Sequence, residues 1–288
     1  MKAVILAGGK GTRLRPLTLS MPKPLVPLAG KPLVRHIIDS LPAEVDEVLL
    51  AVNYMKGRLQ EYFETAELPV KVRLVEENRP LGTGGALKNL REHIDGTFLA
   101  FNGDIVSSLD VSEMLRQHRS RGGIGTIALW RVEDPSAYGV AALDGHRITS
   151  FQEKPPPGEE LSDLINAGVY VFEPEVLEHI PDGVVSLEKE VFPRILDLGM
   201  NGHLFEGHWV DCGTRSSYLE AQNVLLRAAG PEENVFCEGA QVSSGAQLED
   251  CAVLSRAEVA PGAVLRRTIV CPGAKVGAGQ KVYDKIYR

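Results

Sequence analysis

The sequence lacks the features that mark secreted, membrane or nucleic-acid-binding proteins. Only four of its 288 residues are cysteines, with no C-x-x-C pair among them, so we expect reduced thiols rather than a disulfide framework or a zinc site. Met1–Leu6 is too short for a signal peptide, and no apolar run approaches the ~20 residues of a membrane helix. The net charge of −7 excludes a general basic surface for nucleic acid. We therefore expect a cytoplasmic protein with no nucleic-acid and no membrane partner.

Two common phosphate-binding loops are also missing. The P-loop string G-x-x-x-x-G-K-[ST] does not occur. A dinucleotide loop needs G-x-G-x-x-G, but Gly9-Lys10-Gly11 is followed by Leu14 where the third glycine belongs. The acid expected after the second strand is absent as well, because the run Val48–Val52 ends at Asn53. Any phosphate must therefore be bound by a different loop.

The start of the chain contains a candidate for that loop. Lys2–Leu6 is an apolar run long enough for one buried strand, and three glycines and three cations follow it: Gly8, Gly9 and Gly11, with Lys10, Arg13 and Arg15. Glycine lets the backbone approach a ligand because it has no Cβ atom. Backbone N–H groups and cations after a strand predict a phosphate-binding cradle. The alternative is a glycine turn with a solvated basic face.

Segments that suit strands alternate with segments of helical spacing, which predicts an α/β fold with a mainly parallel sheet. The expected strands are Lys2–Leu6, Glu47–Val52, Val70–Val75, Thr97–Phe101, Gly125–Arg131, one beginning at Tyr138, Arg147–Gln152, Ile165–Phe172 and Leu204–Trp209. The expected helices are Leu33–Leu41, Gly57–Thr65, Ala86–His93, Ser186–Leu198 and Ser216–Ala229, and Pro22–Pro32 is expected to be a stiff, extended connector. Because ligands bind at the carboxyl ends of parallel strands, the glycine loop, the loop Glu76–Gly85 and Asp104 should converge on one rim.

From about Asn234 the sequence changes to a six-residue period. Val242, Leu248 and Leu254 stand six apart, and later sets repeat the spacing after slips of one residue: Val259 and Leu265, then Val270, Val276 and Val282. With small residues between them, they are typical of a hexapeptide β-helix of about two to three coils. Such a short helix should pack on the main domain or on another subunit, so we expect a homo-oligomer. The predicted domains are residues 1–230 and a tail of residues 231–288; the alternative is an irregular glycine-rich tail.

Several strings together are typical of one known family. LAGGKGTRLRPLT (Leu6–Thr18) is followed by PKPLVPLAGKPL (Pro22–Leu33), and then by NGD, EKP, NAGVY and WVDCGT. Over roughly the first 225 residues the chain resembles the nucleotide-sugar pyrophosphorylases, which are sugar-1-phosphate nucleotidyltransferases. The resemblance implies a three-layer, doubly wound Rossmann-type sheet of the GT-A kind, with a left-handed β-helix as the tail. It also implies the reaction of a nucleoside triphosphate with a sugar-1-phosphate to give a nucleotide sugar and pyrophosphate.

That reaction brings two polyanions together, so it requires charge neutralisation and in-line positioning rather than a general base. Asp104 and Asp211 each follow a strand, and two carboxylates on one rim suit Mg²⁺; the alternative is a turn aspartate or a helix cap. By resemblance the catalytic residues are Arg13, Lys23, Asp104 and Asp211. The nucleotide would contact Leu6, Ala7, Gly8, Gly9, Lys10, Gly11, Thr12, Arg13, Glu77, Gly82 and Thr83. The sugar phosphate would contact Gly139, Glu153, Lys154 and Asn166, although Lys154 could instead be a solvated lysine.

Glu77 indicates which nucleotide base the protein binds. In relatives that use thymine or uracil nucleotides, a glutamine commonly stands at this place. A carboxylate only accepts hydrogen bonds, which suits the two adjacent donors of guanine. Glutamate also stands there in the guanylyltransferases that the chain resembles, and the runs SLEKEVFP (Ser186–Pro193) and DPSAYGV (from Asp134) are most similar to those for mannose-1-phosphate. The alternative is that Glu77 points into solvent and that Glu76, or backbone alone, meets the base. The alternatives are a heptose-1-phosphate guanylyltransferase, a glucose-1-phosphate thymidylyl- or uridylyltransferase and a catalytically silent regulatory subunit. An acyltransferase is disfavoured because no histidine occurs after His208.

Overall fold

The computed structural model describes residues 1–229 and 234–288. The chain forms two compact units. The first unit comprises Met1–Gly9 and Ile37–Trp209, and the second comprises Lys10–His36 and Val210–Arg288. The predicted boundary between residues 230 and 231, and the predicted helix stop at Gly230-Pro231, lie outside the described residues. Within the described part of the chain, no helix combines the length and the apolar character needed to cross a membrane.

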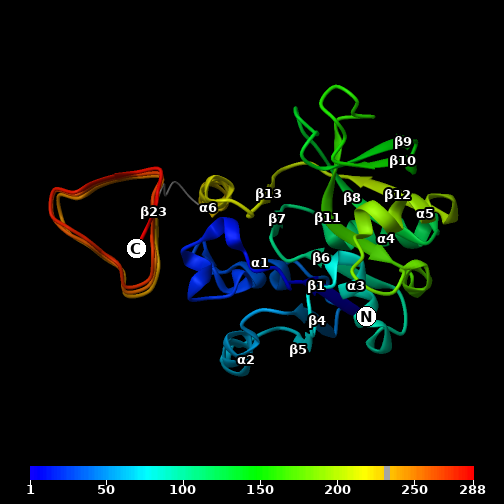
Figure 1. The fold of residues 1–288 in the computed structure, drawn as a ribbon, viewed down its shortest axis with the longest axis horizontal. Coiled ribbons are helices and arrows are strands. Elements are labelled where there is room, and N and C mark those ends of the chain that lie inside the picture. Colours follow the sequence, from blue (N-terminus) through cyan, green and yellow to red (C-terminus); the bar gives the residue numbers. More distant parts are fainter. Residues whose placement is uncertain (230–233) are drawn as a thin grey trace. The chain divides into compact units, whose positions relative to one another are not determined.

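A nine-stranded sheet forms the first unit, in the order β5-β4-β1-β6-β11-β8-β12-β10-β9 (Figure 1). The strands are β1 (Lys2–Leu6), β4 (Glu47–Val52), β5 (Lys71–Glu76), β6 (Phe98–Asn102), β8 (Gly125–Arg131), β9 (Gly139–Asp144), β10 (Arg147–Glu153), β11 (Leu164–Phe172) and β12 (Met200–Leu204). Neighbours within β5-β4-β1-β6 are parallel, as are β8 and β12, whereas β11 is antiparallel to β6 and β8. The expected α/β class is confirmed, and its antiparallel half is an addition that the sequence did not indicate.

Both faces of the sheet are covered. Every residue of β4 is buried, which is the pattern of a strand with helices on both sides of its sheet. Phe98, Tyr170, Phe172 and Phe192 belong to the main hydrophobic core, where the rings of Tyr170 and Phe172 stack with centroids 5.3 Å apart. The helices of the chain are α1 (Leu33–Asp39), α2 (Lys56–Thr65), α3 (Gly82–Asn89), α4 (Val111–Arg121), α5 (Phe192–Ile195) and α6 (Arg215–Ala229).

The expected strand Leu204–Trp209 is wrong. The strand of the sheet is β12, and the chain then loops through Gly207, whose φ of 111° is incompatible with a strand, before β13 (Trp209–Asp211). Strand β12 was not predicted because its sequence MNGHL contains polar residues and forms no apolar run. Asn201 is buried and its Nδ2 donates to the Gly122 carbonyl at 2.7 Å, so the amide N–H has its partner inside the protein rather than in solvent.

Three helical segments also differ from expectation. The segment Ser186–Leu198 is helical and Ser186 caps it, but it consists of a π-helical turn (Leu187–Val191), α5 and a 3₁₀ turn (Leu196–Leu198). Pro193 lies in the first turn of α5, where it cannot donate a backbone hydrogen bond. Helix α3 begins at Gly82, four residues before the expected start. Helix α4 was not expected, although the Asp110 side chain caps it by accepting from the Glu113 N–H.

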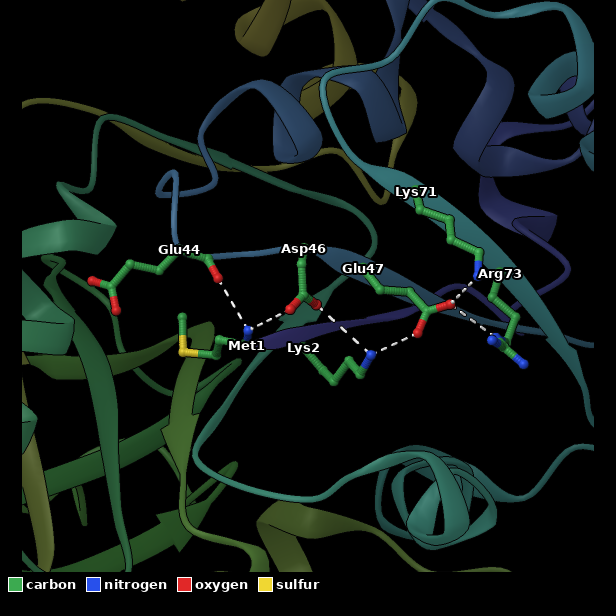
Figure 2. A network of polar contacts seen from close by, with 7 residues as sticks. All are labelled: Met1, Lys2, Glu44, Asp46, Glu47, Lys71 and Arg73. Atoms are coloured by element: carbon green, nitrogen blue, oxygen red, sulfur yellow. Dashed lines mark hydrogen bonds and ion pairs between the residues drawn. The ribbon is translucent and has the colours of Figure 1, made fainter.

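A network of charges lies at the amino ends of the parallel strands (Figure 2). Glu47, at the start of β4, accepts from Lys2 Nζ at 2.8 Å and from Arg73 Nε at 3.0 Å, and Lys71 Nζ lies 3.3 Å away. The Met1 ammonium donates to Asp46 at 3.0 Å. The hydrogen bond from Lys2, followed by those from Arg73 and Lys71, lowers the pKa of Glu47 to about 2 against the opposing effect of burial.

In the second unit, residues 10–36 pack against α6. The Tyr218 hydroxyl donates to the Pro27 carbonyl, and the Ala29 N–H donates to Gln222 at 3.1 Å. The expected extended connector Pro22–Pro32 is more folded than predicted, because it contains a 3₁₀ turn (Lys23–Leu25) and a two-stranded hairpin of β2 (Pro27–Leu28) and β3 (Lys31–Pro32). The prolines therefore shape turns as well as extended backbone.

The tail is a three-sided coil of short parallel strands (Figure 1). Its sheets are β14-β17-β20-β23 (Val235–Phe236, Ala252–Val253, Ile269–Val270, Ile286–Tyr287), β15-β18-β21 (Gln241–Val242, Glu258–Val259, Lys275–Val276) and β16-β19-β22 (Gln247–Glu249, Val264–Arg266, Lys281–Tyr283). Val235 pairs with Ala252, and Ala252 with Ile269, so a coil takes 17 residues, which explains the one-residue slip after each set of hexads. The β-helix is confirmed and is slightly longer than expected. Asn223 of α6 donates to Asp250 at 3.1 Å.

Candidate active site

The glycine loop of the first unit meets Glu77. A Cβ atom on Gly8 would lie 3.0 Å from Glu77 Oε1, so only glycine fits comfortably beside this carboxylate. Glu77 is 5% exposed, and its Oε2 accepts from the Leu81 N–H at 3.2 Å. Burial raises the pKa of Glu77 against the effect of that bond. The alternative that Glu77 points into solvent is therefore wrong.

The NGD sequence ends β6 beside the end of β1. The Gly103 N–H donates to the Leu6 carbonyl at 3.0 Å, and a Cβ atom on Gly103 would lie only 2.7 Å from that oxygen. The glycine therefore allows the two strand ends to approach closely. Asp104 follows directly, so it lies at the carboxyl rim of the sheet beside Leu6, as expected.

Gly139, Glu153 and Lys154 come together where β9 pairs with β10. Gly139 pairs with Glu153, and a Cβ atom on Gly139 would lie 2.9 Å from Glu153 Oε2. Burial, and then the charge of Glu188, raise the pKa of Glu153, while Lys154 opposes them. Lys154 has a left-handed backbone with φ of 52°, and its N–H donates to the Tyr138 carbonyl at 2.8 Å. Its exposed ammonium lies 3.7 Å from Glu153.

Asn166 lies at an irregularity of β11, where the register with β8 shifts. Its Nδ2 donates to the Tyr170 hydroxyl at 2.9 Å, and its Oδ1 accepts from the Gly168 N–H at 2.9 Å. The carbonyl between them, that of Ala167, accepts from Trp209 Nε1 at 2.9 Å. The amide of Asn166 therefore holds the bulge in shape, which limits the hydrogen bonds it has left for a sugar.

Trp209 links this bulge to the Lys154 segment. Its ring meets the Tyr138 ring edge to face, with centroids 5.5 Å apart, and Tyr138 is the residue whose carbonyl holds Lys154. The sequence motifs do not single out Trp209 or Tyr138 for the site. Trp209 begins the string WVDCGT and Tyr138 lies in the run DPSAYGV from Asp134, but an aromatic residue in a motif gives no indication of what it contacts.

Gly82 and Thr83 begin α3 and contact the segment 185–188. A Cβ atom on Gly82 would lie 2.4 Å from the Val185 carbonyl. The Thr83 hydroxyl donates to Glu188 at 2.8 Å and accepts from the Leu187 N–H at 2.9 Å. The Ser186 hydroxyl also donates to Glu188, at 2.7 Å. Thr83 thus joins α3 to the next helical segment, so a nucleotide contact would use its backbone or require this bond to open.

In the second unit, the rest of the glycine-rich loop folds onto Thr18 and Lys23. Gly11 has φ of 59°, and a Cβ atom there would lie 2.9 Å from Thr18 and 3.2 Å from Cβ of Lys23. The Thr18 hydroxyl donates to the Gly11 carbonyl at 2.7 Å. Lys10 and Thr12, also predicted to bind the nucleotide, are exposed. The Cβ of the PKP lysine is therefore held next to the glycine turn.

Arg13 and Asp211 meet at Gly213. A Cβ atom on Gly213 would lie 2.7 Å from Arg13 Nη2 and 2.7 Å from Asp211 Oδ1. The cap of α6 is Thr214, whose hydroxyl accepts from the Ser217 N–H at 3.2 Å. Thr214 is therefore the residue that these bonds show capping α6, and the Asp211 carboxylate lies beside the predicted catalytic cation.

The donor set fits a hard divalent cation. Asp104 and Asp211 offer carboxylate oxygens, and Mg²⁺ needs only one or two of these when phosphate and water complete its shell. No group of three or more His, Cys, Asp or Glu side chains that could hold a metal occurs among the described residues, which disfavours an all-protein metal cage. The two aspartates belong to different units.

The model of the nucleotidyl transferase family matches residues 2–228. The chain belongs to the nucleotidyl transferase family. It is 39% identical over 264 residues to a mannose-1-phosphate guanylyltransferase of Mycobacterium tuberculosis, covering 85% of this chain and 72% of that protein. It is 41% identical over 237 residues to mannose-1-phosphate guanylyltransferase 1 of Arabidopsis thaliana, covering 78% and 65%. The chain thus spans about two thirds of the length of these nucleotidyltransferases.

Solved structures of other proteins share the fold. HddC from Yersinia pseudotuberculosis, solved alone and with GMP-PN, is 28% identical, with a TM-score of 0.65 over 78% of this chain and 99% of that one. A UDP-glucose pyrophosphorylase complexed with UDP-glucose has a TM-score of 0.71 over 79% of this chain and 98% of that one, at 22% identity. The latter supports the fold alone.

Proposed function

We propose that this nucleotidyl transferase is a mannose-1-phosphate guanylyltransferase. It would convert GTP and mannose-1-phosphate into GDP-mannose and pyrophosphate. The family match supports nucleotidyl transfer, and relatives at about 40% identity support the particular substrates.

The observation that carries the choice of base is the position of Glu77. Its carboxylate is buried against Gly8 and forms no ion pair within the part of the chain that the structure describes, and it accepts a hydrogen bond from the Leu81 N–H. A buried carboxylate with spare acceptor capacity is costly unless a ligand donates to it. Guanine presents two adjacent donors to such a group, whereas thymine and uracil present one donor between acceptors.

The chemistry depends on charge neutralisation. A sugar-phosphate oxygen attacks the α-phosphorus of the triphosphate, a P–O bond forms, and the bond to pyrophosphate breaks. No proton needs to leave the attacking phosphate, so a general base is unnecessary. Arg13 and Lys23 would offset the charge of the triphosphate as the leaving group departs. Mg²⁺, when bound by Asp104 and Asp211, would supply further positive charge at the phosphates.

The sugar phosphate would contact the β9–β10 end. Lys154 would bind its phosphate, and the backbone at Gly139 and the carboxylate of Glu153 would read hydroxyl groups. Asn166 would position the bulge as well as donate to the sugar. We also propose that the protein acts in the cytoplasm, as a homo-oligomer.

A pyrophosphate-release assay tests the function. Purified protein with Mg²⁺ is supplied with each of GTP, ATP, UTP and dTTP, crossed with mannose-, glucose-, N-acetylglucosamine- and heptose-1-phosphates. The highest kcat/KM should belong to GTP with mannose-1-phosphate. Better use of dTTP or UTP would overturn the base assignment while leaving nucleotidyl transfer intact. No release from any pair would favour the regulatory-subunit alternative.

A further inference from the structure

The second unit contains a cavity of about 400 Å³ with a strongly basic lining. Arg13 and Arg15 line it from the loop after β1, Thr214, Arg215 and Ser216 from the start of α6, and Lys285 from the last coil of the tail. No acidic side chain is among its lining residues. Four cations from three separate stretches of sequence thus meet around one space in a protein whose net charge is −7.

These four cations form no ion pairs among the described residues, although the Asp211 carboxylate lies near Arg13 at Gly213. The Lys285 ammonium lies 5.9 Å from the ring centre of Tyr287. Other tail cations do pair across coils: Arg266 with Glu249 at 3.0 Å, Arg267 with Asp284 at 3.2 Å and Lys275 with Glu258 at 2.8 Å. Three tail cations are therefore paired with acids of a neighbouring coil, whereas Lys285 has no such partner in the part of the chain that the structure describes.

The start of α6 adds to the positive potential. Thr214 and Ser217 cap the helix reciprocally, with Thr214 N–H donating to Ser217 Oγ at 3.1 Å and Ser217 N–H donating to Thr214 Oγ1 at 3.2 Å. The residues that follow the cap, Arg215 and Ser216, face the cavity. The positive end of the helix dipole and four side-chain cations repel one another unless an anion joins them.

We propose that this cavity binds a diphosphate-type polyanion and that the tail completes the site through Lys285. The charge of two linked phosphoryl groups matches the four cations better than that of a single phosphate does, and arginine forks match phosphate oxygens bidentately. The idea rests on the proposed nucleotidyl transfer, because pyrophosphate is its product and Arg13 belongs to the predicted nucleotide loop. The tail would then act on pyrophosphate binding and release, in addition to any role in assembly.

Direct binding to the full chain tests the site without requiring turnover. Inorganic pyrophosphate is titrated into the wild type and into Lys285→Ala and Arg215→Ala by calorimetry. Each substitution should weaken binding about tenfold, as expected for loss of one charge-assisted hydrogen bond. The matched control is Lys281→Ala, which removes an exposed lysine of the same coil that does not line the cavity, and it should bind like the wild type. Circular dichroism and thermal melting establish that each variant folds.

Two further measurements, GDP binding and the kinetics of the reverse reaction, identify the source of the diphosphate. GDP that binds with the same dependence on Lys285 would assign the site to the diphosphate of a nucleotide, whereas pyrophosphate binding alone would assign it to the free product. In the reverse reaction, Lys285→Ala should raise KM for pyrophosphate about tenfold and leave KM for the nucleotide sugar unchanged.

The proposal is overturned if the wild type does not bind pyrophosphate, or if Lys285→Ala and Lys281→Ala bind it equally. A protein that binds pyrophosphate through Lys285 but turns over no substrate would instead overturn the proposed function and leave the anion site in place.

Discussion

Glu47 and Glu77 are two buried glutamates, 6% and 5% exposed. Glu47 lies where the parallel strands of the main sheet begin, which we call the amino edge, and Glu77 lies where they end, the carboxyl edge. Glu47 begins β4 among Lys2, Lys71 and Arg73, which lower its pKa to about 2 (Figure 2). Glu77 follows β5 beside Gly8, accepts from one backbone N–H, and has its pKa raised by burial. A glutamate at the amino edge is thus paired with three cations, whereas a glutamate at the carboxyl edge accepts one backbone hydrogen bond and has capacity for more.

This difference indicates that the amino edge of the sheet contributes to stability and that the carboxyl edge is the place for ligand binding. A buried carboxylate surrounded by cations contributes to folding, whereas one with few donors costs free energy that a ligand can recover. Catalytic and binding groups are therefore expected at the carboxyl edge, where glycines replace side chains and polar groups have capacity left. Four substitutions test the two edges, in order of decreasing expected effect.

The largest effect is expected at the carboxyl edge. Asp104→Asn should lower kcat at least about a hundredfold, because an anionic ligand for Mg²⁺ at the transferring phosphate is lost. The melting temperature should stay within about 2 °C of the wild type, since the residue lies at a rim rather than in the core. Steady-state kinetics and calorimetry measure both.

A matched control for this carboxylate is Asp110→Asn, six residues further along the chain, where the aspartate caps α4. It should change kcat little and cost about 0.5 kcal/mol or less of stability, because asparagine also caps helices. Full activity of Asp104→Asn would remove Asp104 from the proposed site.

At the amino edge, Glu47→Gln should lower the free energy of unfolding by about 2–3 kcal/mol at pH 7, because three cations lose their common anion. The folded pKa of about 2 lies below the ordinary value of 4.5, so the stabilisation is complete above pH 4.5 and is lost as the pH falls towards 2. Denaturant unfolding across that window should show a shallower acid limb in the variant. A change in kcat per folded molecule would contradict the structural role.

Glu77→Gln should shift kcat/KM away from GTP and towards dTTP or UTP by about tenfold, the effect of one mismatched buried hydrogen bond. The contribution of Glu77 to the free energy of unfolding depends on pH in the opposite direction to that of Glu47. Because folding raises the pKa of Glu77, its contribution is most favourable below its ordinary pKa and is lost as the pH rises. Glu76→Gln, at the adjacent position, is the control and should leave base preference unchanged.

The smallest effect is expected for Trp209→Phe. The change removes the N–H that donates to Ala167 and leaves a ring to pack on Tyr138. KM for the sugar-1-phosphate should rise about threefold while KM for the triphosphate stays constant, because the loss of one neutral hydrogen bond loosens only the Asn166 bulge. Trp130→Phe, at the other tryptophan of the chain, should change neither constant. Equal increases in both constants would indicate general loss of structure.

Much of the fold could be predicted because local pattern and tertiary environment agree. The apolar runs at Lys2–Leu6, Glu47–Val52 and Gly125–Arg131 are strands within those bounds, since strands buried on both faces are apolar throughout. Strand β12 could not be predicted, because Asn201 and His203 are buried polar residues whose partners come from distant segments. The antiparallel direction of β11 is likewise a matter of long-range pairing that the residue pattern does not encode.

The candidate site shows the same division. Motif residues could be listed from the sequence, and several groups of them prove to be neighbours, such as Gly8 with Glu77 and Gly139 with Glu153. Their partners could not be predicted: Glu188 holds Thr83, and Trp209 holds the Asn166 bulge. These contacts join residues far apart in the chain and depend on side-chain directions that only the folded protein defines.

The 17-residue coil of the tail has a consequence for how this chain can change length. Because equivalent positions stack on one another throughout the tail, a whole coil can be duplicated or deleted and each strand still finds a partner in register. An insertion of one residue instead turns interior aliphatic side chains outward in every strand up to the next corner. We expect length variation among similar chains to occur in steps of about one coil, as in other repeat proteins. Such a tail can then lengthen or shorten while the nucleotidyl transferase region before it is unaltered.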